Sequence, residues 1–311
     1  MNRVHGKGSG RLSLLLLVLA AYALAARAGI AVRDDSGAEV RLKEPARRIV
    51  SLAPHITEIL FAAGAGDRVV GTVDYSDYPE PAKRIARIGS YTDLDLETIL
   101  ALKPDLVIGW QSGNSQTHLE TLRRLDIALF LSEPGRLEDV AQNLEQFGEL
   151  AGTSSVAGPA AAAFRARLED LRRHYSGRPR VRTFYQIWAE PLQTVGGSQI
   201  IGSAIRLCGG VNIFGQLSAI APVVSIEAVL AADPEAIVAS GTGESRPDWL
   251  DAWRRWPRLT AAARDNLFFI PPDLIQRHTP RLLDGAERLC RDLETARQRR
   301  PAPITGSHSE R

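Results

Sequence analysis

The chain of 311 residues is 44% hydrophobic and 24% charged, which suits a globular protein with one large core or two modest ones. Its formal net charge at pH 7 is only +2, and it holds two cysteines. This composition excludes wholesale disorder, and the near-neutral balance gives no indication of a nucleic-acid partner.

The N-terminus has the three parts of a secretory signal. Basic residues precede the apolar run 12–26, and Ala26-Arg27-Ala28 has the small-x-small pattern of a cleavage site. Residues 1–28 are therefore predicted to be a signal peptide, whose removal leaves 34 basic against 36 acidic side chains. The alternative, a transmembrane anchor, needs about 20 apolar residues, and this run is shorter.

The next part of the chain, residues 29–152, predicts alternating strands and helices. Residues 31–42 predict a hairpin with a turn at Ser36-Gly37. The strands that follow are expected at 48–52, 69–73, 106–110 and 127–131, and the helices at 57–63, 96–102, 116–125 and 137–150. This alternation predicts a parallel α/β sheet.

Residues 153–178 are predicted to link this first lobe to a second. The stretch 157–173 is rich in Ala, Arg, Leu and Glu and predicts one long helix. Residues 179–298 then predict strands at 181–187 and 267–270 and a terminal helix at 281–298, and Trp249, Trp253 and Trp256 have the spacing of a packed helix stripe. Residues 299–311 are expected to form a disordered tail.

A degraded repeat supports the two lobes. Residues 96–110 and 226–240 each predict a short helix with one Glu, a stop at a proline and an acid, and a buried strand. Glu97 and Glu227 occupy the same place in the two copies, about the length of a small α/β domain apart. A solvated helix face would explain either Glu alone, but their matched positions favour a shared role.

Large aromatic residues follow the predicted strands of the first lobe. Tyr75, Tyr78, Tyr91 and Trp110 all fall just beyond strand ends, where parallel sheets bind ligands. A single aromatic ring just beyond a strand end often covers the edge of the hydrophobic core and binds nothing. Four of them on one rim favour a surface that covers a ligand.

Motifs for catalysis or metal binding are absent from the sequence. It has no G-x-S-x-G, H-E-x-x-H, P-loop or G-x-G-x-x-G after a strand, and no close His pair of the kind that zinc requires. His55 and His278 lie where they could face a cleft, although satisfied surface or loop histidines are the expected interpretation. No metal site, no catalytic residue and no catalytic cofactor are therefore expected.

The two cysteines are Cys208 and Cys290. In an exported protein such a pair can persist as a disulfide, which would tie the terminal helix to the second lobe. The alternative is two separate buried thiols.

Several motifs together resemble the helical-backbone (class III) periplasmic binding proteins, and within them the members that bind cobalamin. They are Ile49-Val50-Ser51-Leu52-Ala53-Pro54 with Thr57-Glu58, Tyr75-Ser76-Asp77-Tyr78-Pro79, Leu102-Lys103-Pro104-Asp105 and Leu207-Cys208-Gly209-Gly210-Val211-Asn212. The resemblance implies two Rossmann-like lobes joined by a single long α-helix, with the ligand in a cleft between them.

The resemblance also implies the ligand, the partner and the residues that meet them. A periplasmic monomer would capture a corrinoid such as cobalamin and deliver it to the permease and ATPase of an inner-membrane ABC transporter. Ligand contacts would come from Tyr75, Tyr91, Trp110, Trp188, Asp273 and Arg277. Glu97 and Glu227 would dock onto arginines of the permease.

Two alternatives remain open. The same fold would serve a receptor for an iron chelate, haem or a siderophore, with His55 or His278 as an axial ligand. A secreted α/β enzyme would have to use Asp77, Asp273 and His278, although it would lack a recognisable nucleophile or metal motif.

Overall fold

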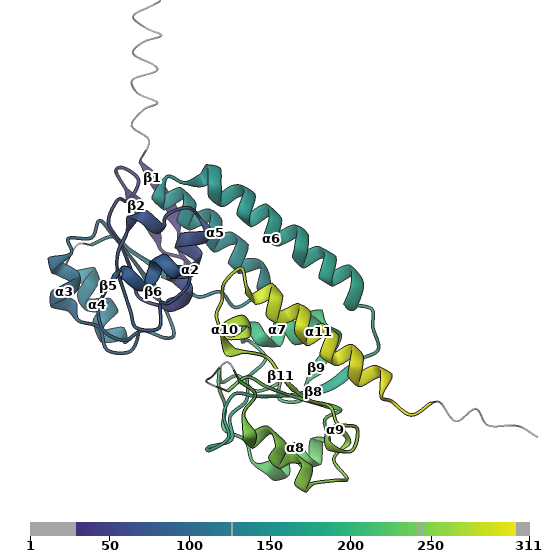
Figure 1. The fold of residues 1–311 in the computed structure, drawn as a ribbon. Helices are drawn as coiled ribbons and strands as arrows, with labels where there is room; N and C mark the ends of the chain where they lie inside the picture. Colours follow the sequence, from purple (N-terminus) through teal and green to yellow (C-terminus); the bar gives the residue numbers. More distant parts are fainter. Residues whose placement is uncertain (1–28, 126, 242, 244, 303–311) are drawn as a thin grey trace, which may run out of the picture.

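The computed structural model describes residues 29–302 except 126, 242 and 244. The predicted signal peptide and positions 303–311 of the predicted tail lie outside the described residues. Figure 1 shows two lobes joined along one side by a long helix. Among the described residues, no helix combines the length and the apolar character that a membrane span requires.

The first lobe is built on a parallel sheet with strand order β5-β4-β3-β6-β7. Its strands are β3 (Ile49–Ser51), β4 (Val69–Thr72), β5 (Ala86–Arg87), β6 (Leu106–Trp110) and β7 (Leu129–Ser132). The antiparallel hairpin β1 (Ile30–Arg33) and β2 (Glu39–Leu42) precedes it, as predicted. Side chains alternate across β6, so that Leu106 and Ile108 join one core and Val107 the other.

Helices cover both faces of this sheet, which explains why its central strands are continuous apolar runs. The helices are α2 (Pro54–Ala62), α3 (Leu96–Ala101), α4 (Gln116–Arg124) and α5 (Leu137–Ala151), with the short 3₁₀ turns η1 (Gly66–Arg68) and η2 (Glu80–Arg84). The buried residues of α2 and α5 share one core, and those of α3 and α4 share the other.

The second lobe repeats the plan with strand order β11-β10-β8-β9, all parallel. Its strands are β8 (Val181–Gln186), β9 (Gly210–Asn212), β10 (Ala236–Ala239) and β11 (Leu267–Phe269). Its helices are α7 (Ile200–Leu207), α8 (Ile226–Ala232), η3 (Asp248–Arg255), α9 (Thr260–Ala263), α10 (Pro272–Ile275) and α11 (Leu282–Gln298). The fold class predicted from the sequence, a two-lobed α/β protein, is confirmed.

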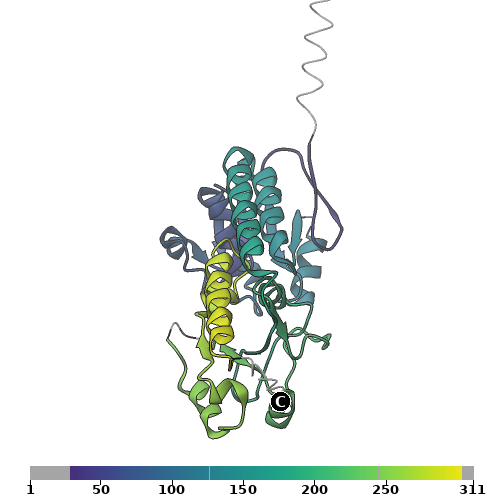
Figure 2. The ribbon, with the colours of Figure 1, turned by 90° about the vertical axis from the view of Figure 1, so that its right-hand side faces the viewer.

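Helix α6 (Ser154–Tyr175) connects the lobes and is 22 residues long. It begins three residues before the predicted stretch and accommodates Pro159 near its start, because a stripe from Ala157 to Leu171 is buried against its neighbours. Figure 2 shows α6 and α11 running along the same side of the molecule, in agreement with their contacts.

The sequence repeat is also a structural repeat. Side chains of Asp95 and Ser225 cap α3 and α8, accepting hydrogen bonds from the backbone N–H groups of Thr98 at 2.9 Å and Ala228 at 3.2 Å. Each helix is followed by a central strand, β6 in one sheet and β10 in the other.

The turns after the two helices match as well. Lys103 and Asp233 both have positive φ, 48° and 41°, immediately before a proline. Asp105 and Glu235 then each accept a hydrogen bond from a backbone N–H at the edge of the neighbouring strand, at 3.0 and 3.2 Å. The same local interactions therefore join each copy of the repeat to the neighbouring strand of its own sheet.

Three local predictions were wrong, and several short elements were not predicted. Helix α2 begins at Pro54, because proline is favoured in the first turn. Two short strands, β5 and β9, and helix α10 carry too little apolar signal to be predicted. The Trp-rich segment is 3₁₀ helix η3, although its tryptophans do pack against the lobe. Disorder was expected from residue 299, but Arg299 and Arg300 bond to the second lobe.

The expected disulfide is present and joins Cys208, which follows α7, to Cys290 in α11. Both residues are fully buried. The bond holds the terminal helix against the second lobe, where Arg297 of the same helix also donates a hydrogen bond of 2.6 Å to the carbonyl of Cys208.

Replacing both cysteines by alanine should lower the free energy of unfolding by about 2–5 kcal/mol, because the bond constrains a long loop in the unfolded chain. Urea denaturation measures this change. Wild-type protein under reducing conditions is the control and should show a similar loss. Unchanged midpoints in both samples would contradict the stabilising role.

Candidate ligand-binding site

The carboxyl ends of both parallel sheets meet at the contact between the lobes, here called the seam. His55 follows β3, Trp110 ends β6, and His278 lies beyond β11, and their rings are neighbours. Ligands of open parallel sheets bind beyond the carboxyl ends of the strands. The seam is therefore where the fold itself predicts a ligand site.

Trp110 is the best-supported residue of this site. Its backbone N–H donates a hydrogen bond of 2.6 Å to Oδ1 of Asn114, whose Nδ2 donates to the carbonyls of Leu52 and Tyr91 at 2.9 and 2.7 Å. A Cβ at Gly113 would lie 1.9 Å from the Trp110 ring, so only glycine fits there. Asn114 thus fixes three loops of the first lobe around one indole.

Tyr91 and Trp110, each predicted from the sequence as a ligand contact, form an aromatic pair with ring centroids 5.8 Å apart and planes inclined by 44°. Tyr75 and Trp188 lie on loops of opposite lobes and are exposed, by 72% and 38%. Neither pairs with the Trp110 ring among the described aromatic residues. The structure therefore brings two of the four predicted aromatic contacts together.

The two predicted polar residues, Asp273 and Arg277, are bonded to each other at 3.1 Å. Arg277 also crosses the seam to Asp77 at 2.8 Å. Burial alone would raise the pKa of Asp77, but the hydrogen bond and charge of Arg277 outweigh it and hold that pKa below its ordinary value. Because both carboxylates face this guanidinium, they are poorly suited to act as the acid and base of an enzyme.

A second ion pair across the seam was not predicted from the sequence. Both oxygens of Glu58 accept from Arg281, each at 2.7 Å, and Glu58 is only 3% exposed. The guanidinium also lies 3.8 Å from the centre of the Tyr78 ring. The hydrogen bonds to Glu58 raise the pKa of Arg281. The sequence feature that could have revealed this ion pair is Glu58 itself, an acid within the apolar run that forms α2.

The interpretation of His55 and His278 as satisfied surface or loop residues was wrong. Both are buried, with 5% and 6% exposure. Nε2 of His55 and both ring nitrogens of His278 have no hydrogen-bond partner among the described residues. An enzyme that uses His278 as a base would need a group to orient it, and none is present in the described part of the chain.

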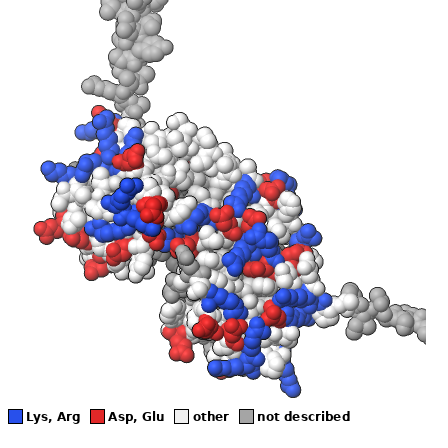
Figure 3. Space-filling view, in the orientation of Figure 1, with Lys and Arg blue, Asp and Glu red and all other residues white. Residues whose placement is uncertain are grey.

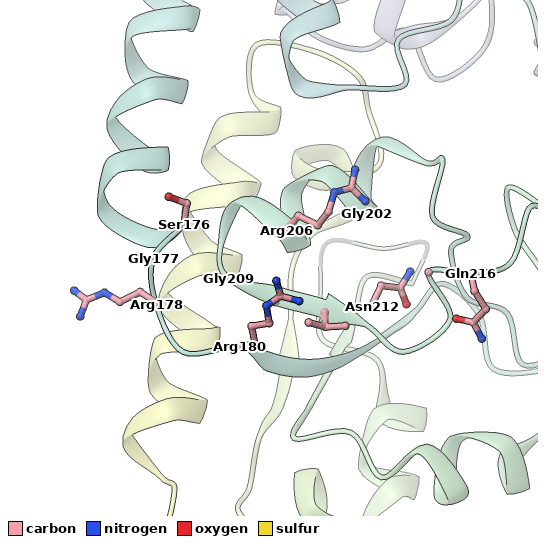
Figure 4. Close-up of a pocket in the computed structure, with 12 residues that line it drawn as sticks. Ser176, Gly177, Arg178, Arg180, Gly202, Arg206, Gly209, Asn212 and Gln216 are labelled. Atoms are coloured by element: carbon pink, nitrogen blue, oxygen red, sulfur yellow. The ribbon is translucent and has the colours of Figure 1, made fainter.

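A separate cavity of about 630 Å³ lies in the second lobe, between the end of α6, α7 and the edge strand β9 (Figure 4). Arg178, Arg180 and Arg206 are among its lining residues. The carboxyl ends of α6 and α7 meet there, and a guanidinium beside such an end complements its negative charge. For example, Arg178 donates to the carbonyl of His174 at 3.3 Å. Arg206 donates to Ser203 at 2.8 Å and to the carbonyl of Gly197 at 3.4 Å, so two of the three arginines have local partners.

Glu97 and Glu227 are both exposed, and each is the second residue of its helix. Their position at the N-terminal ends of α3 and α8 stabilises the negative charge. Figure 3 shows acidic and basic side chains interspersed over one face, with the two lobes separated by a notch. Both side chains are therefore accessible from the solvent.

Comparison with known proteins agrees with this architecture. Residues 49–274 match the family described as periplasmic binding protein. The chain belongs to this family, whose members bind substrates and are not enzymes.

The individual proteins to which the chain is similar have more specific names than the family. It is 40% identical to a vitamin B12-binding protein of Vibrio campbellii over 82% of this chain and 92% of that protein. It is 36% identical to one of Yersinia pestis over 85% and 91%. The crystal structure of the periplasmic vitamin B12 binding protein BtuF of Vibrio cholerae matches with a TM-score of 0.76 and 38% identity, over 82% of this chain and 99% of that one. A haem-binding protein, BhuT, shares the fold at 20% identity, with a TM-score of 0.70 over 81% and 99%.

Replacing Arg281 by Met should lower the free energy of unfolding by about 3–5 kcal/mol, because it leaves the Glu58 carboxylate buried without its partner. Chemical denaturation of Glu58→Gln, Arg281→Met and the double variant completes a double-mutant cycle. The double variant should be more stable than Arg281→Met alone. Additive losses would contradict coupling across the seam.

Proposed function

We propose that this protein captures cobalamin in the periplasm and delivers it to an inner-membrane ABC transporter. The observation that carries the proposal is the Tyr91–Trp110 pair at the seam, in a chain whose relatives are vitamin B12-binding proteins. The proposal includes residues 1–28 as a signal peptide, a monomeric mature protein and cobalamin as bound ligand, with no catalytic cofactor. It also divides the mature chain into lobes 29–152 and 179–298 around the linking segment 153–178.

The chemistry of a corrinoid suits the seam. A corrin presents a broad, partly apolar face rimmed by amides, which flat aromatic rings and a few polar groups can bind. Tyr91 and Trp110 would supply the aromatic surface, and Asp273 and Arg277 the polar contacts. Tyr75 and Trp188, exposed on opposite lobes, would close on the ligand from its two sides.

An iron chelate is the second candidate ligand. The observation in its favour is the pair of buried imidazoles with unpartnered nitrogens, since a neutral imidazole is a good axial ligand for haem iron. Against it, the similarity to haem-binding proteins lies at 20–24% identity and extends to the fold alone.

The proposed ligand is tested by titrating the mature protein with cyanocobalamin, haemin and a ferric siderophore. Cyanocobalamin should bind most tightly, and failure to bind it would refute the proposal. Trp110→Ala should weaken this binding by about 1–3 kcal/mol, as expected for an aromatic anchor. Trp256→Ala is the control and should leave the affinity unchanged, because Trp256 packs against a hydrophobic cluster of the second lobe that does not include Trp110.

Glu97 and Glu227 would dock the two lobes onto the transporter. Charge-assisted pairs between carboxylates and arginines fix the orientation of a complex and speed its formation. The matched capping and exposure of α3 and α8 support a shared role, because each lobe presents one acid in the same local geometry.

Replacing both Glu97 and Glu227 by Arg should abolish vitamin uptake by whole cells while ligand affinity stays unchanged, because the reversed charges would repel the permease arginines. Uptake of labelled cyanocobalamin measures this loss. Glu120→Arg with Glu149→Arg makes the same change of net charge at two other exposed sites and should leave uptake intact. Normal uptake by the Glu97/Glu227 variant would exclude the docking role.

A further inference from the structure

Three rings meet at the seam, two from the first lobe and one from the second. The centroid of His55 lies 5.2 Å from those of Trp110 and His278, and the centroids of Trp110 and His278 are 6.1 Å apart. Both imidazoles meet the indole edge to face, with planes inclined by 86° and 89°. The indole is therefore held by one histidine from each lobe.

The two histidines are more deeply buried than the Trp110 ring that they contact. Tyr91 is 37% exposed and Trp110 is half-buried, whereas His55 and His278 are almost fully covered. A ligand on the exposed side of Tyr91 and Trp110 would thus meet those rings first. The two histidines would act on it through Trp110.

The charges around the imidazoles favour their neutral form. Burial lowers the pKa of His278 to about 4, and burial together with His278 and Arg277 lowers the pKa of His55 well below 6.5. The charged and titratable side chains on the surrounding segments are Glu58, Asp77, Tyr78, Tyr91, Asp273, Arg277 and Arg281. Their carboxylates are already paired with Arg277 or Arg281, so none of these three acids is left to stabilise an imidazolium.

We infer that His55 and His278 are positioning residues of the ligand site, which hold the Trp110 ring from opposite lobes and couple its orientation to the closure of the seam. The inference rests on the proposed function, because it assigns the rings that support the proposed anchor. Protonation of His55 would place a cation in a buried site that already faces Arg277, and protonation of His278 would place one in the buried position beside it. The Trp110 ring and the seam would then loosen together.

The sign of the pH dependence follows from the lowered pKa. In the unfolded chain His278 takes up a proton near pH 6.5, whereas in the folded protein it does so only near pH 4. The contribution of His278 to stability is therefore complete above pH 6.5 and falls as the pH drops from 6.5 towards 4. His55 has the same sign.

The first experiment is a double-mutant cycle on cyanocobalamin affinity. His278→Ala should weaken binding about threefold to tenfold in the wild-type background and have little effect in the Trp110→Ala background, because its influence passes through the indole. His278→Gln, which keeps a polar side chain of similar reach, should retain most of the affinity. His118→Ala is the control. Equal losses in both backgrounds would overturn the positioning role.

The second experiment needs no ligand, so it separates failure of this inference from failure of the proposed function. The indole N–H resonance of Trp110, assigned by its loss in Trp110→Phe, should shift as the pH falls from 7 to 4 in the wild-type protein. It should stay in place in the His55→Gln/His278→Gln variant. A wild-type resonance that does not move, or an equal shift in the variant, would overturn the inference even if cyanocobalamin binds.

Discussion

The Glu58–Arg281 pair is the interaction on which the arrangement of the two lobes most depends. Helix α6 carries the chain from one lobe to the other along one side, so contacts between side chains hold the opposite side of the seam. A bidentate pair with a buried carboxylate is a directional contact. If this pair were broken, the Glu58 carboxylate would remain charged in a buried position that water does not solvate. The ion pair between Arg277 and Asp77, at 2.8 Å, adds a second point of attachment across the seam.

The proposed site is organised around this fixed seam. Asn114 and Gly113 set the position of Trp110 from within the first lobe, whereas His278 meets the ring from the second. A site that is already ordered loses little side-chain entropy when a ligand binds. The exposed rings of Tyr75 and Trp188 are the parts of the proposed site that remain free to adapt.

The elements that sequence reasoning found are those with a strong local signal. The copies at 96–110 and 226–240 could be recognised because the same caps, prolines and apolar strands recur, and the structure repeats their turns at Lys103 and Asp233. Strand β9 could not be predicted, because Gly-Val-Asn carries no apolar pattern, and it forms at the edge of the sheet through its pairing with β8. Helix α6 passes through Pro159 because packing against α5 and α11 outweighs the local preference.

For the candidate site, the aromatic residues at strand ends were predictable from the topology rule for parallel sheets. The contacts across the seam were not, since Arg281 lies 223 positions from Glu58 and Arg277 lies 200 positions from Asp77. No periodicity links residues so far apart. The burial of His55 and His278 depends on the same juxtaposition, which explains why the expectation of surface histidines failed.

One apolar core runs through both lobes. Residues of α2 and α5 in the first lobe, the buried stripe of α6, and α7 and α11 in the second belong to a single contiguous cluster. A protein cut at the linking helix would expose this interior on both fragments, in addition to the smaller apolar cluster that each lobe has of its own. The shared cluster therefore couples the stability of the two lobes, so that an interaction that orders one lobe also stabilises the other.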